Sequence, residues 1–249
     1  KYFSNSGCTT EITEEDTKFY RTITIDNGIS GLVTSNVDKA IAGTTVTLTV
    51  SHLIDTSTLQ VNSGSGTLAD AGNGPYTFPV PAADVTVTAS TATTYSVNLP
   101  ANMEIVSATN TADGSGKYIS GTVVTFKASF SYTASNVYDG ANTLTADDSG
   151  NYSVTVGTAD ITVTATIEHS SNIDLSQAPS DFTVVDGDVL TGSTSHTVSI
   201  ANGASITLND ATITGGIVCA GTATITLVGT NSVTGLSRNT SDPNTNSYN

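Results

Sequence analysis

The stretch ASITLNDATITGGIVCAGTATITLVGTNSV, residues 204–233, contains one short phrase twice. ITLNDATI at 206–213 is followed by ITLVGTNSV at 225–233, so the phrase begins again after nineteen residues. Both copies are rich in Ile, Leu, Val and Thr, with Gly, Asn or Asp between them, which is typical of short strands and turns. A sheet of hairpins does not require repeats of equal length. A β-helical coil does require them, because each rung stacks on the one before it and like residues align.

The flanking residues continue this pattern, with strand-like TVSI at 197–200 and GIVC at 216–219. We therefore predict a short right-handed parallel β-helix over residues 173–236. In it, residues one rung apart superpose: Ile206 under Ile225, Leu208 under Leu227 and Ile213 under Val233. One rung cannot bury its own apolar face, and about three are usually needed. So short a coil must pack against the preceding part of the chain, continue in further sequence, or stack on another molecule.

A second, longer repeat lies upstream of the predicted coil. Two pairs of segments match: GTTVTLTV (43–50) with GTVVTFKA (121–128), and PYTFPVPAADVTVTAS (75–90) with NYSVTVGTADITVTAT (151–166). The offsets, 78 and 76 residues, differ only as loop insertions between fixed strands would make them differ. Two copies of one module are therefore expected, at residues 20–91 and 92–168.

Within each copy, apolar residues alternate with polar ones. Val46, Leu48 and Val50 fall on one face of TVTLTV, and Val85 and Val87 do so in DVTVTA. A period of two over four to eight residues predicts half-buried antiparallel strands. The expected fold is therefore all-β: two tandem small antiparallel β modules followed by a short right-handed parallel β-helix. An N-terminal extended arm (1–19) and a polar tail (237–249) are expected to flank them.

The composition restricts the classes of partner and the setting. The chain has 249 residues, 22 acidic against 7 basic, and a formal charge of −15. Binding to nucleic acid or to anionic membrane surfaces is disfavoured, because both need Lys and Arg. No apolar run reaches the roughly 18–20 residues that a membrane span requires. Only 12% of residues are charged, and abundant Thr, Val, Gly and Asn is typical of β-rich extracellular proteins. We expect an extracellular protein, secreted or attached to the cell surface.

The tandem modules resemble a known bacterial family. The first copy contains ITIDNG (23–28), GTTVTLTV (43–50) and PAADVTVTA (81–89), in the order of the divergent surface repeats grouped with the internalin B-repeats. The second copy keeps the closing phrase as GTADITVTA (157–165). The middle of each copy departs from the family pattern, with SHLIDTSTL and SYTASNVYDG in place of its aromatic positions. The resemblance implies stalk-like domains in secreted or surface-anchored bacterial proteins, and it implies no catalysis.

The C-terminal part resembles a second group. VSIANGASITLNDATITGGIVCAGTATITLVGTNSVTG (198–235) is similar to β-helical segments in large secreted proteins of Bacteroidetes and related bacteria. This resemblance implies an adhesin or a carbohydrate-binding role. In that group the coil runs on for more rungs, whereas here the sequence turns polar after residue 236.

No catalytic or cofactor-binding constellation is evident, and we expect no enzyme activity. A β-helix lyase needs clustered Asp with Lys or Arg on one face, whereas the coil offers Asp188 and Asp210 with only Arg238 as a basic residue. Calcium is the one cofactor considered, since it prefers oxygen ligands in turns. The candidate ligands are Asp113, Asp147, Asp148, Asp186 and Asp188. Solvated turn charges are the alternative for all five.

The two cysteines, Cys8 and Cys219, lie far apart in the sequence. They can be two unrelated small residues, form a disulfide between the arm and the coil, or bridge two subunits, and spacing does not decide between these.

We therefore expect the protein either to bind a partner or to form part of an extracellular structure. The leading hypothesis is a surface adhesin or a structural appendage or filament subunit, whose open coil end and N-terminal arm allow self-assembly. Its partners would be further copies of itself, or a glycan or protein of a host or cell surface. The alternative is a carbohydrate-binding module of a secreted protein that targets glycans, although no aromatic residue lies between Phe182 and Tyr248 to stack on sugars.

Overall fold

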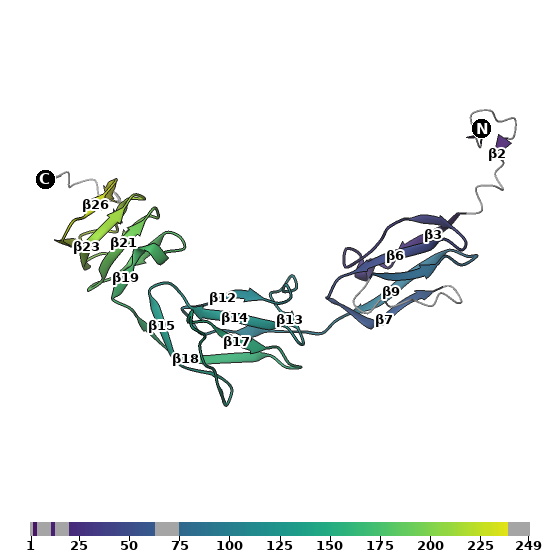
Figure 1. The fold of residues 1–249 in the computed structure, drawn as a ribbon, viewed down its shortest axis with the longest axis horizontal. Coiled ribbons are helices and arrows are strands. Elements are labelled where there is room, and N and C mark those ends of the chain that lie inside the picture. Colours follow the sequence, from purple (N-terminus) through teal and green to yellow (C-terminus); the bar gives the residue numbers. More distant parts are fainter. Residues whose placement is uncertain (1, 4–10, 13–19, 63–74, 239–249) are drawn as a thin grey trace. The chain divides into compact units, whose positions relative to one another are not determined.

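The computed structural model describes residues 2–3, 11–12, 20–62 and 75–238, whose strands Figure 1 shows. Apart from strands, these residues form two single-turn 3-10 helices, η2 (Asn27–Ile29) and η3 (Leu175–Gln177). The predicted all-β class, with antiparallel sheets followed by a parallel β-helix, is confirmed. The boundary between two compact units falls within the second module, and the first unit comprises Lys1–Val97, Ala108–Val123 and Thr155–Ile161.

The first module consists of two sheets that enclose one core. The strand orders are β5–β3–β9–β7 and β4–β6–β8. The bounds are β3 (Tyr20–Ile25), β4 (Val33–Ser35), β5 (Lys39–Ile41), β6 (Thr45–Val50), β7 (Ile54–Asn62), β8 (Tyr76–Pro79) and β9 (Val85–Thr91). The alternation predicted from the sequence decides burial, since Val46, Leu48, Val85 and Val87 are all buried in this core.

One strand pair of the first module is parallel. β3 lies beside β9 with Ile23 opposite Val85 and Ile25 opposite Val87, while the other pairs of the two sheets are antiparallel. Alternating apolar residues determine which face of a strand is buried, but not the direction of its neighbour. The sequence pattern therefore predicted the strands of this module without this pairing.

The second module repeats the arrangement. Its sheets have the orders β11–β18–β15–β16 and β12–β14–β17, with a separate pair β10–β13. The bounds are β10 (Thr94–Tyr95), β11 (Val97–Asn98), β12 (Met103–Ala108), β13 (Tyr118–Ile119), β14 (Val123–Ala128), β15 (Tyr132–Asp139), β16 (Asn142–Thr143), β17 (Tyr152–Thr155) and β18 (Ile161–His169). Val124 and Phe126 of β14 are buried, as are Ile161 and Val163 of β18.

Equivalent hydrogen bonds, as well as equivalent strands, occur in the two modules. The carboxylate of Asp84 accepts the backbone N–H of Thr22 at 2.9 Å, and that of Asp160 accepts the N–H of Ser96 at 2.8 Å. Two glycines with φ near +85° also match, since Gly43 N–H donates to Val80 O at 2.7 Å and Gly121 N–H donates to Val156 O at 2.8 Å. These matched details follow the offsets of the sequence repeat.

The C-terminal coil has about three turns built from two parallel sheets. Their orders are β19–β21–β23–β25, with β26 also on β23, and β20–β22–β24–β27. The bounds are β19 (Asn172–Asp174), β20 (Phe182–Val184), β21 (Val189–Thr194), β22 (Val198–Ile200), β23 (Ser205–Ile213), β24 (Ile217–Cys219), β25 (Thr224–Val228), β26 (Ser232–Val233) and β27 (Leu236–Arg238).

The register of the coil superposes like residues, as the repeat predicts. Three pairs face one another across neighbouring rungs: Ile206 with Ile225, Leu208 with Leu227, and Ile213 with Val233. The residues of the earlier rung fill the core, where Ile206, Leu208 and Ile213 are buried. A rung thus provides the apolar floor on which the next rung packs.

One detail of the coil differs from the expected pattern of separate short strands. Residues 205–213 form the single strand β23, which bends at Asp210, where φ is +52°. The side chain of Asp210 accepts the backbone N–H of Thr230 in the next rung at 2.8 Å. A left-handed conformation is accessible to Asp, which explains how the strand turns a corner there without a glycine.

The two ends of the chain are described only in part. In the predicted arm, β1 (Tyr2–Phe3) pairs antiparallel with β2 (Glu11–Ile12). The rest of the arm, with Cys8, and most of the predicted tail lie outside the described residues. The possible disulfide of Cys8 with Cys219 therefore stays a prediction. Cys219 is half-buried and packs against the core of the coil.

Candidate functional site

Asp113, one of the calcium candidates, accepts hydrogen bonds from donors of its own turn and from Thr94 of β10. Its carboxylate accepts the backbone N–H groups of Ser115 at 2.8 Å and Lys117 at 2.9 Å, and the hydroxyl of Thr94 at 2.7 Å. The N–H of Lys117, followed by the hydroxyls of Thr94 and Ser115, holds the pKa of Asp113 well below its ordinary value. The side chain thus stabilises a turn.

Asp147 has the same role in the turn before β17. Its carboxylate accepts the backbone N–H groups of Ser149 at 2.8 Å and Asn151 at 2.9 Å, and the side-chain amide of Asn151 at 3.2 Å. The two donors of Asn151 are the main reason that the pKa of Asp147 is lowered. Its neighbour Asp148 is exposed to solvent.

The remaining two candidates lie in the first rungs of the coil. Asp186 accepts the backbone N–H of Ser205, in the next rung, at 2.7 Å. Asp188 is fully buried and accepts the N–H of Val185 at 2.9 Å on one oxygen, while its other oxygen lies 2.7 Å from Nε2 of His169. Both carboxylates thus link segments that are distant in sequence.

The five acidic candidates do not gather into a shared site in the structure. Within residues 20–62 and 75–238, no three His, Cys, Asp or Glu side chains come together in a group suited to a metal ion. Calcium needs six to eight oxygen ligands, which a single turn carboxylate cannot supply.

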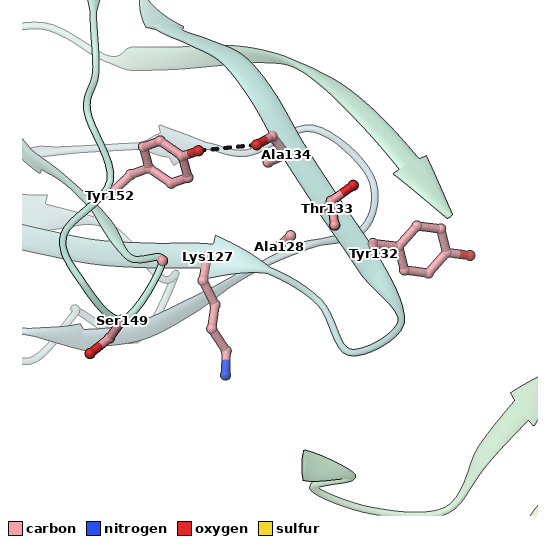
Figure 2. A pocket seen from close by; sticks show the side chains of 8 residues that line it. Lys127, Ala128, Tyr132, Thr133, Ala134, Ser149 and Tyr152 are labelled. Atoms are coloured by element: carbon pink, nitrogen blue, oxygen red, sulfur yellow. Dashed lines mark hydrogen bonds between the residues drawn. The ribbon is translucent and has the colours of Figure 1, made fainter. Parts of the chain in front are cut away.

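A polar hollow lies on the second module between the end of β14, the start of β15 and the turn before β17. It measures about 320 Å³ and is lined by Lys127, Ala128, Tyr132, Thr133, Ala134, Ser149, Gly150 and Tyr152. Figure 2 shows the hydroxyl of Tyr152 donating to the carbonyl of Ala134, at 3.1 Å, while the ring of Tyr132 points away from that of Tyr152. The two rings therefore form no common platform.

Lys127 is the one charged group of this hollow. Its amino group lies 3.8 Å from the carboxylate of Glu104, and both side chains are nearly half exposed. A pair this exposed contributes little to stability. The hollow offers hydroxyl and amino groups to a polar ligand, but Tyr132 also packs edge-on against His169, with ring centroids 5.4 Å apart.

A second hollow, of about 320 Å³, is formed by the last rung of the coil. It is lined almost entirely by apolar side chains, namely Leu208, Ile217, Ile225, Leu227 and Val233, with Asn231. Leu227, which continues the buried column below it, is 65% exposed, against 1% for Leu208. The difference arises because no further rung among the described residues covers β25.

The backbone at this end is also available for pairing. β25 and β27 are the last strands of their sheets within the described residues. The N–H of Thr224 donates to Ala204 O at 2.9 Å, toward β23. Because amides along a strand point alternately to its two sides, those of Ile225 and Leu227 are directed away from β23. The end of the coil thus combines an apolar surface with the free edge of a strand. The sequence predicted the column of like residues, but the exposure of Leu227 depends on no further described strand lying beside β25.

Comparison with families of proteins, with curated proteins and with solved structures finds no significant match to this chain. The described residues include no helix with the length and hydropathy of a membrane span.

Proposed function

We propose that the chain is a non-catalytic extracellular surface protein, an adhesin or a structural appendage subunit, that assembles through the last rung of its β-helix. The observation that carries this proposal is the exposed end of the coil, where Leu227 continues a buried apolar column into solvent beside the free edge of β25. A coil end of this kind is a template for another chain, because it presents unpaired N–H and C=O groups together with apolar surface.

The upstream modules support a scaffold role in this proposal. They repeat the same strands and the same capping hydrogen bonds, and their acidic turn residues are held by backbone donors. Repetition of one stable module is a common way to build a spacer, and the low content of reactive side chains fits an extracellular setting. The partner in adhesion would be a glycan or protein of a cell surface.

Electron microscopy and sedimentation of the purified chain test the proposal together. We expect species larger than a monomer whose fraction increases with protein concentration. The substitution Leu227→Asp, which places a charge on the exposed column, should abolish them. A chain that stays monomeric at every concentration, and whose coil end binds no surface protein or glycan, would contradict the proposal.

A carbohydrate-binding module is the second candidate, and the hollow of Figure 2 is the observation that favours it. Its hydroxyl groups, Lys127 and the ring of Tyr132 are groups that bind sugars in general. A glycan array with the native chain and Tyr132→Ala tests this candidate. Saturable binding to one polysaccharide that is lost in Tyr132→Ala would rank it first, and an array without binding would remove it.

A further inference from the structure

We propose that the last rung of the coil pairs with the last rung of a second copy around a two-fold axis, so that assembly through this end stops at two chains. This inference rests on the proposed function and names its partner and its stoichiometry. Its argument concerns the two ends of the coil, the geometry of β25, and the distribution of charge.

The first rung of the coil is in contact with residues of the second module. The ring of Phe130, in the loop before β15, meets the ring of Phe182 of β20 edge-on, with centroids 4.9 Å apart, and packs against the core of the coil. His169 at the end of β18 contacts the buried Asp188 at 2.7 Å. The N–H of Ser170 donates to Ser131 O at 2.8 Å. A second coil that stacked head to tail on the first rung would have to displace the packing of Phe130 against Phe182.

The geometry of β25 suits a copy of itself. Its amides at Ile225 and Leu227 point away from β23, and antiparallel pairing of two identical strands satisfies such groups on both chains at once. Antiparallel pairing of identical strands is what a two-fold axis produces, and two-fold interfaces use the same patch on both subunits. The two apolar hollows would then close against each other.

Charge favours this part of the surface for contact between copies. The chain carries a formal charge of −15, so two copies repel each other over most approaches. Residues 211–238, which include the whole last rung, contain no Asp or Glu. Contact between like chains is therefore least opposed at the end of the coil.

Two segments of the chain itself are the competing occupants. Residues 239–249 contain one large apolar residue, Tyr248, which is little to fill a hollow lined by five apolar side chains. Residues 1–19 carry four acidic residues, and the strands β1 and β2 within them already pair with each other. A second copy offers both an apolar surface without acidic residues and the edge of β25.

The test uses sedimentation velocity on the full chain from roughly 1 to 200 µM, a range that brackets micromolar Kd values. We expect a monomer that converts to a dimer and to nothing larger. Leu227→Asp and Leu227→Lys should each raise the dimer Kd at least tenfold. Leu227 is 65% exposed, so we expect neither change to disturb the core, and thermal melting of each variant tests this independently. Val106→Asp, at a residue 49% exposed on β12, is the matched control and should leave the Kd unchanged.

Mixing the two charged variants decides the symmetry. In a two-fold interface the Asp of one chain lies near the Lys of the other, so the equimolar mixture should regain dimer that neither variant forms alone. Assemblies that grow beyond two chains and disappear in Leu227→Asp would overturn the two-fold inference and leave the proposed function standing. Dimers that resist Leu227→Asp would overturn the inference, as would a native chain that stays monomeric while residues 1–19 or 239–249 protect the coil end. Absence of both assembly and surface binding would remove the proposed function as well.

Discussion

The carboxylate of Asp210 lies directly against Gly229 of the following rung, in the place that a side chain on Gly229 would occupy. The same carboxylate accepts the N–H of Thr230 at 2.8 Å. Asn202 and Gly221 repeat the relationship, since Asn202 fills the space above Gly221 and accepts the N–H of Thr222 at 3.1 Å. At each of these corners, a polar side chain extends along the axis of the coil into the next rung. It occupies the place of a Cβ atom there, so the residue in that rung has to be glycine.

Gly229→Ala should therefore weaken the last rung. The methyl group would collide with the Asp210 carboxylate, and φ at Gly229 is +70°, so we expect a loss of about 2–3 kcal/mol in local stability. Hydrogen exchange of the Thr230 amide measures this loss. Gly203→Ala is the matched control, because φ there is +80° and nothing lies within 4 Å of the added methyl group. If Gly203→Ala lowers local stability as much as Gly229→Ala does, backbone strain alone explains the loss, and the contact with Asp210 does not contribute.

His169→Ala should destabilise the coil together with the second module. It removes the His169 ring as a hydrogen-bond partner of the fully buried Asp188 side chain, which also accepts the backbone N–H of Val185. Loss of a partner for a buried polar group costs about 1–3 kcal/mol. Chemical denaturation, with hydrogen exchange to locate the effect, measures the change. His169→Gln keeps a donor at this position and should recover part of the loss. Equal stability of the native and His169→Ala chains would contradict this role for the contact.

The duplicated carboxylates predict matched effects. Asp84→Ala and Asp160→Ala each remove the acceptor for one strand amide, of Thr22 and of Ser96 respectively. We expect each to cost roughly 0.5–1 kcal/mol in its own module and to leave the other unchanged. Amide exchange at Thr22 and Ser96 reports the two modules separately. Effects that spread equally over both modules in each variant would show that the modules do not unfold as separate copies.

Acid should weaken the turn at Asp113. Its pKa in the folded chain lies well below its ordinary value, so its contribution to stability is complete above the unfolded pKa of about 4 and is lost as the pH falls toward the folded pKa. The difference in stability between the native chain and Asp113→Ala should be constant near neutral pH and shrink below about pH 4. Urea denaturation at a series of pH values measures it. The exposed Asp148→Ala provides the comparison, and a difference independent of pH down to pH 2 would contradict the role of the carboxylate.

Most of the features of the fold that could be predicted from the sequence were predicted from its repeats. A spacing of nineteen residues placed Ile206 below Ile225 because equal rungs superpose, and the register agrees. Offsets of 76 and 78 residues relate the two predicted modules, and Asp84 and Asp160, which are 76 residues apart, make equivalent hydrogen bonds. In both cases a repeat in the sequence produces a repeat in the structure, because equivalent segments form equivalent strands.

What the sequence did not predict depends on neighbours distant in the chain. The parallel pairing of β3 with β9 joins residues near 23 to residues near 85, and neither strand pattern specifies its partner. The pairing of Asp210 with Gly229 is evident only in the structure, because a single Asp and a single Gly are common turn residues. Likewise the exposure of Leu227 depends on which strands lie beside β25, and no alternation of residues encodes that.

The central claim is that the free edge of β25 is an assembly surface, and hydrogen exchange as a function of protein concentration tests it most directly. The amides of Ile225 and Leu227 point away from β23, whereas that of Thr224 is bonded to Ala204 within the chain. We expect protection of Ile225 and Leu227 to rise with concentration while that of Thr224 stays the same. Exchange at Ile225 and Leu227 that is as fast in concentrated as in dilute protein would contradict the account.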